Sequence, residues 1–194
     1  MNRDDKTAIA REIKAQVLIL AGFVAVMWLV ELVDIVVFHQ RLNIFGVHPR
    51  RLDALWGIFF MPFLHGGLPH LLANTIPFIT LGWLVMLRDI RDFWVVTVIG
   101  ILTSGLGVWL IGASGTVHIG ASGLVFSYLG YLLLRGYFER SFTAIFLSVV
   151  VGIFYGSLVF GVLPLQQGVS WEGHLFGFLG GALSAYLLAE RPQM

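Results

Sequence analysis

The chain is poor in charge and has no cysteine. Only 12% of its 194 residues are Asp, Glu, Lys or Arg, and the formal net charge is +1. The absence of cysteine excludes disulfides, thiolate catalysis and cysteine-ligated metal. The scarcity of charge excludes a disordered chain and a nucleic-acid-binding protein, because both depend on many charged side chains.

Apolar residues fill the sequence instead. They make up 58% of the chain, against about 45–50% in soluble domains, and a water-soluble globule of this length could not bury so many. The composition therefore predicts an all-α polytopic membrane protein. At about 20 residues per span, residues 1–194 suffice for one compact membrane domain, in which residues 1–16 form a short polar cytoplasmic segment.

Six long apolar segments are the predicted transmembrane helices. They lie at residues 17–38, 69–87, 93–111, 120–135, 142–162 and 172–189. The apolar run within 39–68 is broken by Pro62 and is too short to span a bilayer, so this region is predicted to be a loop lying partly in the interface. With the N-terminus inside, nine of the 12 Lys and Arg residues face the cytoplasm. That bias predicts six spans with N-in and C-in topology.

Polar residues gather at the starts of the second, fourth and sixth segments. The three clusters are His65, His70 and Asn74; the stretch from Gly120 to Gly123 with Ser122 inside it; and Gly173 with His174. These three segments all run from outside to inside, so the clusters share one depth on the outer side. Polar groups in a membrane are costly and are therefore functional candidates. We expect them to line a wet, outward-facing cavity.

The clustered residue types are those of an acyl-transfer site. A serine hydroxyl needs a general base, and histidine is the usual base near neutral pH. Ser122 opens a helix, so backbone N–H groups around it are unpaired and can stabilise an oxyanion. His70 and Asn74 lie one turn apart on one helix face and can point at the same site. A glycine stripe that starts at Gly173 lets the last helix approach closely, which would bring His174 near Ser122.

Three stretches resemble the rhomboid intramembrane serine proteases: HGGLPHLLAN (65–74), HIGASGLVFSYLGYLLLRG (118–136) and WEGHLFGFLGG (171–181). The resemblance extends over essentially the whole chain and implies a six-helix rhomboid-like bundle. It implies a catalytic dyad, with Ser122 as nucleophile and His174 as general base. It also implies an oxyanion hole formed by His70, Asn74 and the backbone N–H of Ser122.

Other residues support or depart from this pattern. Gly120 and Gly123 permit a tight entry into the helix and close packing, and Phe126 falls where the family places an aromatic residue against the histidine ring. Many family members carry a Trp-Arg pair in the loop after the first helix, whereas here Trp56 is followed by Gly57. The departure concerns the docking of this loop in the membrane rather than the active site.

The implied function is cleavage of transmembrane or juxtamembrane segments of membrane proteins by an integral, multi-pass enzyme. We expect it in a bacterial cytoplasmic membrane, with the site open to the outer face. Its partners are the lipid bilayer and single-span substrates with helix-weakening residues near the cut; no nucleic acid, cofactor or metal is expected. The alternatives are a non-catalytic rhomboid-like protein that binds membrane clients, and a small transporter or channel.

Several residues compete for the same roles. Ser114 lies in a second Gly-Ala-Ser-Gly tetrapeptide, and His118 could rival His174 as base, although a loop hydrogen bond is the competing interpretation. His65 is expected to order the loop before the second helix. Glu31 and Asp34 are expected at the outer surface, solvated among headgroups or held by a local polar contact. Glu172 and His174 lie on different sides of a helix, which argues against a triad, and residues 163–170 could form a mobile cap.

Overall fold

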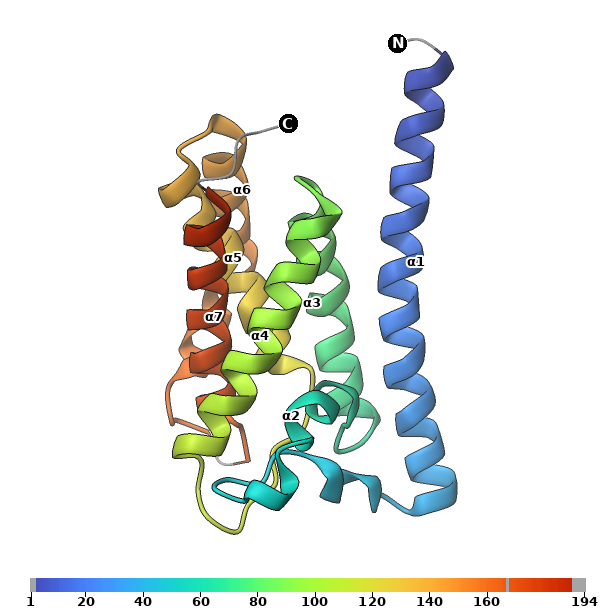
Figure 1. Ribbon diagram of the computed structural model, residues 1–194, viewed down its shortest axis with the longest axis vertical. Coiled ribbons are helices and arrows are strands. Elements are labelled where there is room, and N and C mark those ends of the chain that lie inside the picture. The colour runs from blue at the N-terminus through green and yellow to red at the C-terminus, as the bar shows by residue number, and fades with distance from the viewer. Residues whose placement is uncertain (1–2, 167, 190–194) are drawn as a thin grey trace.

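The apolar segments fold into long helices. The computed structural model describes residues 3–166 and 168–189, and this part of the chain contains no β-strand. The long helices run alongside one another, with the start of α1 and the end of α7 at one end of the bundle, here called the terminal end; the opposite end is the loop end (Figure 1). Their bounds are α1 Arg3–Val33, α3 Leu68–Met86, α4 Ile90–Ile111, α5 Ser122–Glu139, α6 Phe142–Tyr155 and α7 Trp171–Ala189.

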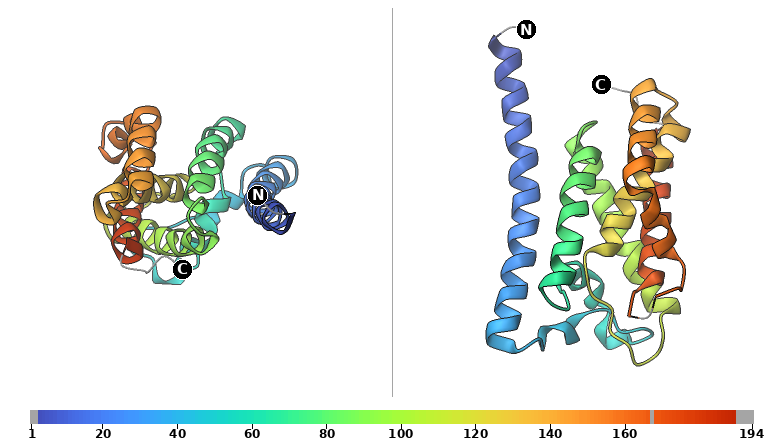
Figure 2. Two further views of the ribbon diagram at one scale, coloured as in Figure 1. Left: turned by 90° about the horizontal axis from the view of Figure 1, so that it is seen from above. Right: turned by 180° about the vertical axis from the view of Figure 1, so that it is seen from behind.

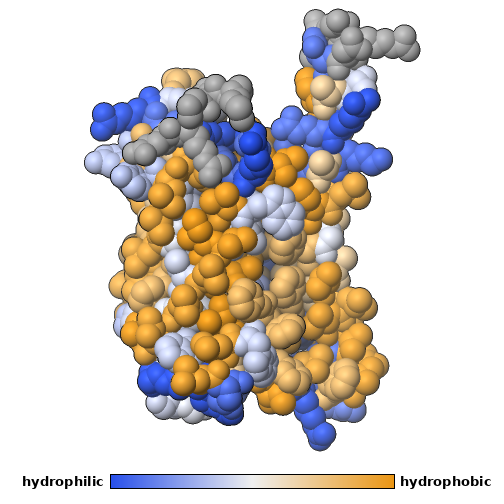
Figure 3. Space-filling view, viewed as in Figure 1, coloured by the Kyte–Doolittle hydropathy of each residue, from blue (hydrophilic) through white to orange (hydrophobic). Residues whose placement is uncertain are grey.

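The protein is an integral membrane protein. Four helical segments are long and apolar enough to cross a membrane, namely Asp5–Phe38, Leu68–Met86, Ile90–Ile111 and Phe142–Val162. Figure 3 shows apolar side chains covering the middle of one face, with hydrophilic residues gathered toward both ends. Four of the six predicted spans thus have the length and composition that crossing requires; the count of six stays a prediction.

The other two predicted spans are α5, which packs inside the bundle, and α7, which buries one face against it and leaves Leu179 and Leu183 exposed on the other. Helix α5 contacts α3, α4, α6 and α7, and Tyr137 is its one exposed residue. Helix α7 packs against α4 and α5, and Figure 2 shows from above how these helices are grouped while α1 stands to one side. Because α5 meets protein on almost every side, small and polar residues can replace the apolar ones that a lipid-facing helix needs. This explains its less apolar sequence.

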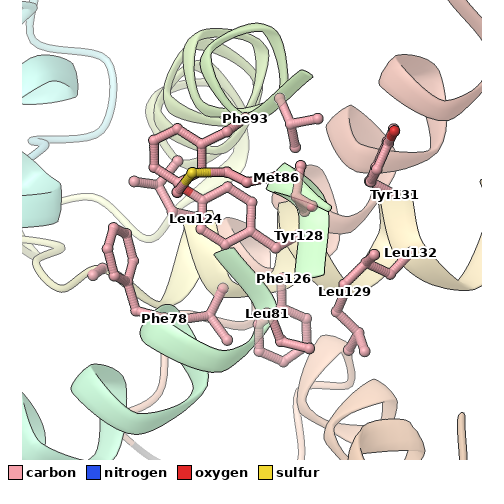
Figure 4. Packing of buried hydrophobic residues seen from close by; sticks show 14 of the residues in the cluster. Phe78, Leu81, Met86, Phe93, Leu124, Phe126, Tyr128, Leu129, Tyr131 and Leu132 are labelled. Atoms are coloured by element: carbon pink, nitrogen blue, oxygen red, sulfur yellow. The ribbon is translucent and has the colours of Figure 1, made fainter. Parts of the chain in front are cut away.

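The hydrophobic core is centred where α3, α4 and α5 meet (Figure 4). Phe78, Phe93 and Tyr128 each lie on a different one of these helices and are at most 1% exposed. The Tyr128 ring centroid lies 5.6 Å from that of Phe78 and 5.5 Å from that of Phe93. The Tyr128 hydroxyl and the Thr97 hydroxyl are 2.8 Å apart, so the buried phenol has a hydrogen-bond partner. In a membrane, packing of this kind holds helices together through van der Waals contact.

Buried charges join the helices at the terminal end. Arg135 Nε lies 2.7 Å from Glu139 Oε2, and Arg88 Nη1 lies 3.6 Å from the same carboxylate and 3.7 Å from Asp92 Oδ2. The Tyr131 hydroxyl donates to Asp92 at 2.9 Å, and Arg88 also donates to a backbone carbonyl near the end of α7. This set, called the charged network below, links the ends of α3, α4, α5 and α7.

The loop between α1 and α3 covers part of the loop end. Its short helices are η2 Leu42–Phe45, η3 Leu52–Ala54, α2 Gly57–Phe60 and η4 Met61–Phe63. Trp56 is 38% exposed and Phe60 53%, as expected of aromatic residues at an interface. A Cβ on Gly57 would overlap the backbone carbonyl of Gly46. Two passes of the loop therefore cross where the related pattern has an arginine, and only glycine fits there.

Three helix bounds differ from those predicted. Helix α1 already begins at Arg3 rather than near residue 17, because no glycine or proline precedes Gly22 and the polar residues are good helix formers. Helix α5 continues past Arg135 to Glu139, since the Arg135 side chain is buried and paired. The predicted fifth segment changes at Tyr155 from α-helix to the 3₁₀ helix η5, Gly156–Val162.

Two acidic residues, one in α1 and one in the π-helical turn that follows it, are buried rather than solvated. Glu31 and Asp34 are each 1% exposed. Asp34 starts the π-helical turn Asp34–Phe38, and its Oδ1 accepts a hydrogen bond from the Leu42 N–H at 3.0 Å, which is the local polar contact expected of it. The Glu31 carboxylate faces the backbone N–H groups of His65 and Gly67, although neither oxygen completes a hydrogen bond with a described residue.

Candidate active site

Ser122 is the first residue of α5, which begins partway along the bundle rather than at the loop end (Figure 1). Gly120 has a φ of +112°, in the left-handed region that favours glycine, and turns the chain into the helix. Its N–H donates to the Met61 carbonyl at 2.9 Å, which fastens the turn to the interfacial loop. Ser122 is half-buried, and the N–H groups of a first helical turn have no intrahelical acceptor.

His174 lies in the first turn of α7 and is 8% exposed. Its Nδ1 is 2.9 Å from the backbone oxygen of Gly161. Because a carbonyl oxygen can only accept, Nδ1 carries the proton, and Nε2 of the neutral ring keeps its lone pair. Phe126 of α5 stacks on the ring, with centroids 4.1 Å apart and planes 7° apart. The imidazole is thus held in one orientation and in the tautomer that a general base requires.

Glycines at the α5–α7 contact bring the two helix starts to the same level. A Cβ on Gly177, one turn after His174, would overlap the backbone carbonyl of Gly123. In the next turn of α5 the Ser127 hydroxyl donates to the Gly177 carbonyl at 2.9 Å. The backbones therefore meet at the residue that follows Ser122. Among the described residues, neither Ser122 Oγ nor His174 Nε2 has a hydrogen-bond partner.

His70 and Asn74, on α3, lie against the turn that precedes Ser122. A Cβ on Gly120 would lie 2.8 Å from His70 Nε2 and 3.6 Å from Asn74 Nδ2. His70 Nδ1 accepts a hydrogen bond from the Gly66 N–H at 3.2 Å, so the proton of the neutral ring is on Nε2. Asn74 Nδ2 donates one N–H to the His70 carbonyl at 3.2 Å and has a second to give. Two donors therefore flank this turn.

His65 lies behind His70 in the same region. It is fully buried; its Nε2 accepts from the Ala121 N–H at 3.4 Å, and its ring centroid is 5.2 Å from that of His70. Burial lowers the pKa of His65 to about 4, with a smaller contribution from neighbouring His70. The ring is therefore neutral near pH 7, as an acceptor at Nε2 has to be. These contacts are those of a residue that orders the segment before α3.

The competing residues are engaged elsewhere. Ser114 is exposed and accepts a hydrogen bond from the Arg50 guanidinium. His118 uses both ring nitrogens, Nδ1 with the Ser170 hydroxyl at 2.6 Å and Nε2 with the Thr116 hydroxyl at 2.8 Å. Burial lowers the pKa of His118, and the charge of Glu172 opposes that shift. Neither Ser114 nor His118 is hydrogen-bonded to Ser122 or His174.

Two participants had no role in the sequence-based prediction. Gly161 orients His174 through its backbone oxygen, and a main-chain acceptor has no signature in the sequence. It also has to be small, since a Cβ there would lie 2.8 Å from Phe126 Cζ and 3.3 Å from His174 Nδ1. Ser104 of α4 packs against Gly123, where a Cβ would lie 2.7 Å from the Ser104 hydroxyl oxygen. A serine in an apolar segment is too common to single out.

Comparison with known proteins adds a second line of evidence. The family model described as Rhomboid domain matches residues 52–191, which contain every candidate site residue. RHOMBOID-like protein 4 of Arabidopsis thaliana is 32% identical over 151 residues, covering 72% of this chain and 36% of that protein.

Bacterial relatives match over more of their length. An uncharacterized protein of Mycobacterium tuberculosis is 45% identical over 176 residues, covering 86% of this chain and 72% of the relative. An uncharacterized protein of Mycobacterium leprae is 42% identical over 175 residues, covering 86% of this chain and 69% of the relative. Because 86% of this chain is more than residues 52–194 contain, the match to these relatives begins before residue 52, where the match to the family model starts.

Proposed function

The chain belongs to the rhomboid family, and from that membership we propose that it is an intramembrane serine endopeptidase with Ser122 as nucleophile and His174 as general base. The observation that carries the proposal is the state of His174. Its Nδ1 faces a carbonyl, its face is stacked on Phe126, and its unengaged Nε2 lies across the glycine contact from the start of α5. A ring that is fixed at Nδ1 and on its face, and whose Nε2 has no partner among the described residues, has the features that a general base needs.

The first half of the reaction forms an acyl-enzyme. Ser122 Oγ attacks the carbonyl carbon of the scissile peptide while His174 Nε2 takes the hydroxyl proton. The carbonyl oxygen becomes an oxyanion that accepts hydrogen bonds from His70 Nε2–H, Asn74 Nδ2–H and the Ser122 backbone N–H. The imidazolium then gives its proton to the leaving amine as the C–N bond breaks. The Gly161 carbonyl and Phe126 hold the ring in place through both transfers.

The second half hydrolyses the acyl-enzyme. His174 Nε2 takes a proton from water as the water oxygen attacks the ester carbon, and the same donors hold the second oxyanion. The proton returns to Ser122 Oγ as the ester bond breaks, releasing the new carboxyl terminus. The sequence of steps consumes one water and one peptide bond and restores the site.

The setting of the reaction is also proposed. Six spans with both termini in the cytoplasm, forming one domain in a bacterial cytoplasmic membrane, place the site on the outer side, and the mycobacterial relatives support a bacterial origin. Substrates are membrane proteins, and we expect single-span ones. A helix hides its peptide bonds in its own hydrogen bonds, so residues that weaken the helix near the cut favour cleavage.

Covalent labelling tests the proposed nucleophile. Purified protein in detergent is treated with a fluorophosphonate probe, and the modified residue is located by peptide mass spectrometry. We expect labelling of wild type at Ser122 and loss of both labelling and cleavage of a single-span substrate in Ser122→Ala and His174→Ala. Circular dichroism and thermal unfolding of each variant check that the fold persists.

Two serines serve as matched controls. Ser114→Ala removes the duplicate motif, and Ser170→Ala removes the serine that contacts His118. These two variants test only where the label is attached, whatever its rate, and Ser122 should remain the labelled residue in both. Label on either of these residues in place of Ser122, or full cleavage by Ser122→Ala, refutes the assignment. Absence of any label in a folded wild-type protein favours a client-binding protein without catalysis.

A further inference from the structure

A side-chain hydrogen bond joins the segments that lead to the two proposed catalytic residues. His118 Nδ1 and Ser170 Oγ are 2.6 Å apart, although 52 positions separate them in the chain. His118 precedes Ser122 by one helical turn's worth of residues, and Ser170 precedes His174 by the same interval. Neither residue belongs to the machinery described above.

The His118 side of this bond is anchored to the interfacial loop. Its N–H donates to the Val47 carbonyl at 3.0 Å, and its carbonyl accepts from the Val47 N–H at 2.9 Å. A Cβ on Gly46, next to Val47, would overlap the His118 carbonyl, so the two segments pack without a gap. Its ring Nε2 is held by Thr116. His118 is therefore fixed on both its backbone and its ring.

The Ser170 side is built into the start of α7. The Ser170 carbonyl accepts the His174 N–H at 3.1 Å, the first hydrogen bond of the turn that carries the imidazole. Gly173 packs against the same serine, where a Cβ would lie 3.1 Å from the Ser170 hydroxyl oxygen. A shift of Ser170 along the bundle thus carries His174 with it.

We propose that His118 and Ser170 are positioning residues, whose hydrogen bond sets how the start of α7 lies relative to the start of α5 and hence how His174 faces Ser122. This inference rests on the proposed function. The glycine contact and the hydrogen bond from Ser127 to the Gly177 carbonyl hold the two helices together beyond their first residues, so the ends at which both helices begin need a restraint of their own. The 2.6 Å hydrogen bond between His118 and Ser170 supplies this restraint, because it joins the segments that lead into the two helices. Since Ser122 and His174 are not hydrogen-bonded to each other here, their alignment has to come from such outside contacts.

The groups around the His118 ring define how the bond can be tested. They are the hydroxyls of Thr116 and Ser170 and the carboxylate of Glu172, whose charge acts on the ring. An asparagine side chain places its amide near the Nδ1 position of histidine, and a glutamine side chain places its amide near Nε2. His118→Asn therefore retains the bond to Ser170, whereas His118→Gln retains only the bond to Thr116. Ser170→Thr retains the hydroxyl and Ser170→Ala removes it.

The experiment compares these variants by cleavage kinetics on a single-span substrate and by the rate of fluorophosphonate labelling of Ser122. We expect His118→Gln and Ser170→Ala to lower kcat and the labelling rate about 10-fold with KM little changed, because misalignment of reacting groups is felt in the chemical step. His118→Asn and Ser170→Thr should stay within about three-fold of wild type, the size of a weakened rather than lost hydrogen bond. The double variant His118→Gln/Ser170→Ala should be no slower than the slower single variant, since both remove one contact.

The outcomes separate this inference from the proposed function. A wild-type enzyme that labels at Ser122, with His118→Gln and Ser170→Ala equally active, overturns the positioning role alone. So do losses that multiply in the double variant, and so does equal loss in His118→Asn and His118→Gln, which would mean that bulk rather than the bond matters. A wild-type protein that never labels at Ser122 instead removes the proposed function on which the inference rests.

Discussion

At the scale of single residues, the site depends on contacts that restrain rings. His174 is held on its face by Phe126 and at its edge by the Gly161 carbonyl, while His70 is held through Nδ1 by the Gly66 N–H. The two rings have opposite tautomers as a result. One presents a lone pair and the other a donor, which are the two capacities that acyl transfer asks of histidine.

The Phe126 contact gives a prediction for a conservative change. Phe126→Leu keeps an apolar side chain but removes the stacked ring, an interaction worth about 0.5–1.5 kcal/mol beyond burial. If that interaction orients the imidazole in the transition state, kcat falls by up to about 10-fold while KM changes little. Steady-state cleavage of a single-span substrate measures both constants.

A second aromatic residue controls for lost packing. Phe23 of α1 contacts the rings of Phe63, Phe78 and Phe93 on the side of the bundle away from His174. Phe23→Leu should lower the thermal unfolding temperature and leave kcat unchanged. A similar drop in kcat in both variants means that general loosening, rather than the ring on His174, is responsible.

The roles of residues were predictable to different degrees. Polar side chains in otherwise apolar segments marked four residues as candidates, namely Ser122, His70, Asn74 and His174. The structure gathers them around the starts of α5 and α7. The orientation of His174 was beyond sequence reasoning, because its partner at Nδ1 is a main-chain oxygen. The loop hydrogen bond expected as the alternative for His118 is confirmed, but its partner Ser170 could not be foreseen, since nothing in the sequence relates two loop residues so far apart.

At the scale of helices, the separation of α5 and α7 is set by glycine residues, which have no side chain to hold the two backbones apart. Gly177→Ala places a Cβ on the Gly123 carbonyl, so the helices have to move apart. We expect about 1–3 kcal/mol of destabilisation, typical of overpacking, together with loss of most activity, because Ser122 and His174 separate with the helices. Thermal unfolding in detergent and substrate cleavage measure the two effects.

Gly22 provides the matched control on a helix. It lies in α1, and a Cβ there meets nothing within 4 Å. Gly22→Ala should therefore be neutral or slightly stabilising, as expected for alanine in an open helix position, with activity unchanged. If Gly177→Ala behaves in the same way, the close contact of α5 and α7 has no part in holding the site.

Helix positions followed from hydropathy, whereas helix ends followed from particular contacts. All six predicted segments fall on helices of the structure. The extension of α5 depends on the pairing of Arg135 with Glu139, a buried arginine that a charge count places at the membrane edge. The short helices between residues 39 and 68 escaped prediction because each is only three or four residues long. At that length, tertiary contacts outweigh local propensity.

At the scale of the whole molecule, the two ends of the bundle are held differently. The candidate site, in the half of the bundle nearer the loop end, is joined by glycine contacts and neutral hydrogen bonds, while the terminal end is joined by the charged network. Stability and chemistry are thus divided between the ends, and they should respond separately to substitution.

Glu139→Gln tests this division. The Arg135 and Glu139 side chains are each 7% exposed, and removal of one partner leaves a buried charge without its counter-ion, which typically costs about 3–5 kcal/mol. We expect a marked fall in the unfolding temperature, with the labelling rate of Ser122 nearly unchanged in the folded protein. Differential scanning of the purified variant beside fluorophosphonate kinetics gives both values.

An exposed pair on the same side of the bundle is the control. Arg91 and Asp89 have side chains 66% and 39% exposed, and surface pairs contribute about 0–1 kcal/mol. Arg91→Gln should therefore leave both measurements close to wild type. A labelling rate that falls in Glu139→Gln as far as stability does would contradict the separation of the two ends.

The buried acids of α1 have a consequence for how the chain is made. Asp34 receives its hydrogen bond from Leu42, so its partner emerges from the ribosome almost with it. The backbone N–H groups that face Glu31 belong to His65 and Gly67, which are synthesised only after the whole intervening loop. During biogenesis, α1 therefore enters the bilayer carrying a carboxylate whose surroundings do not yet exist. The helix α1 can therefore reach its final position in the membrane only after the start of α3 has been synthesised and inserted.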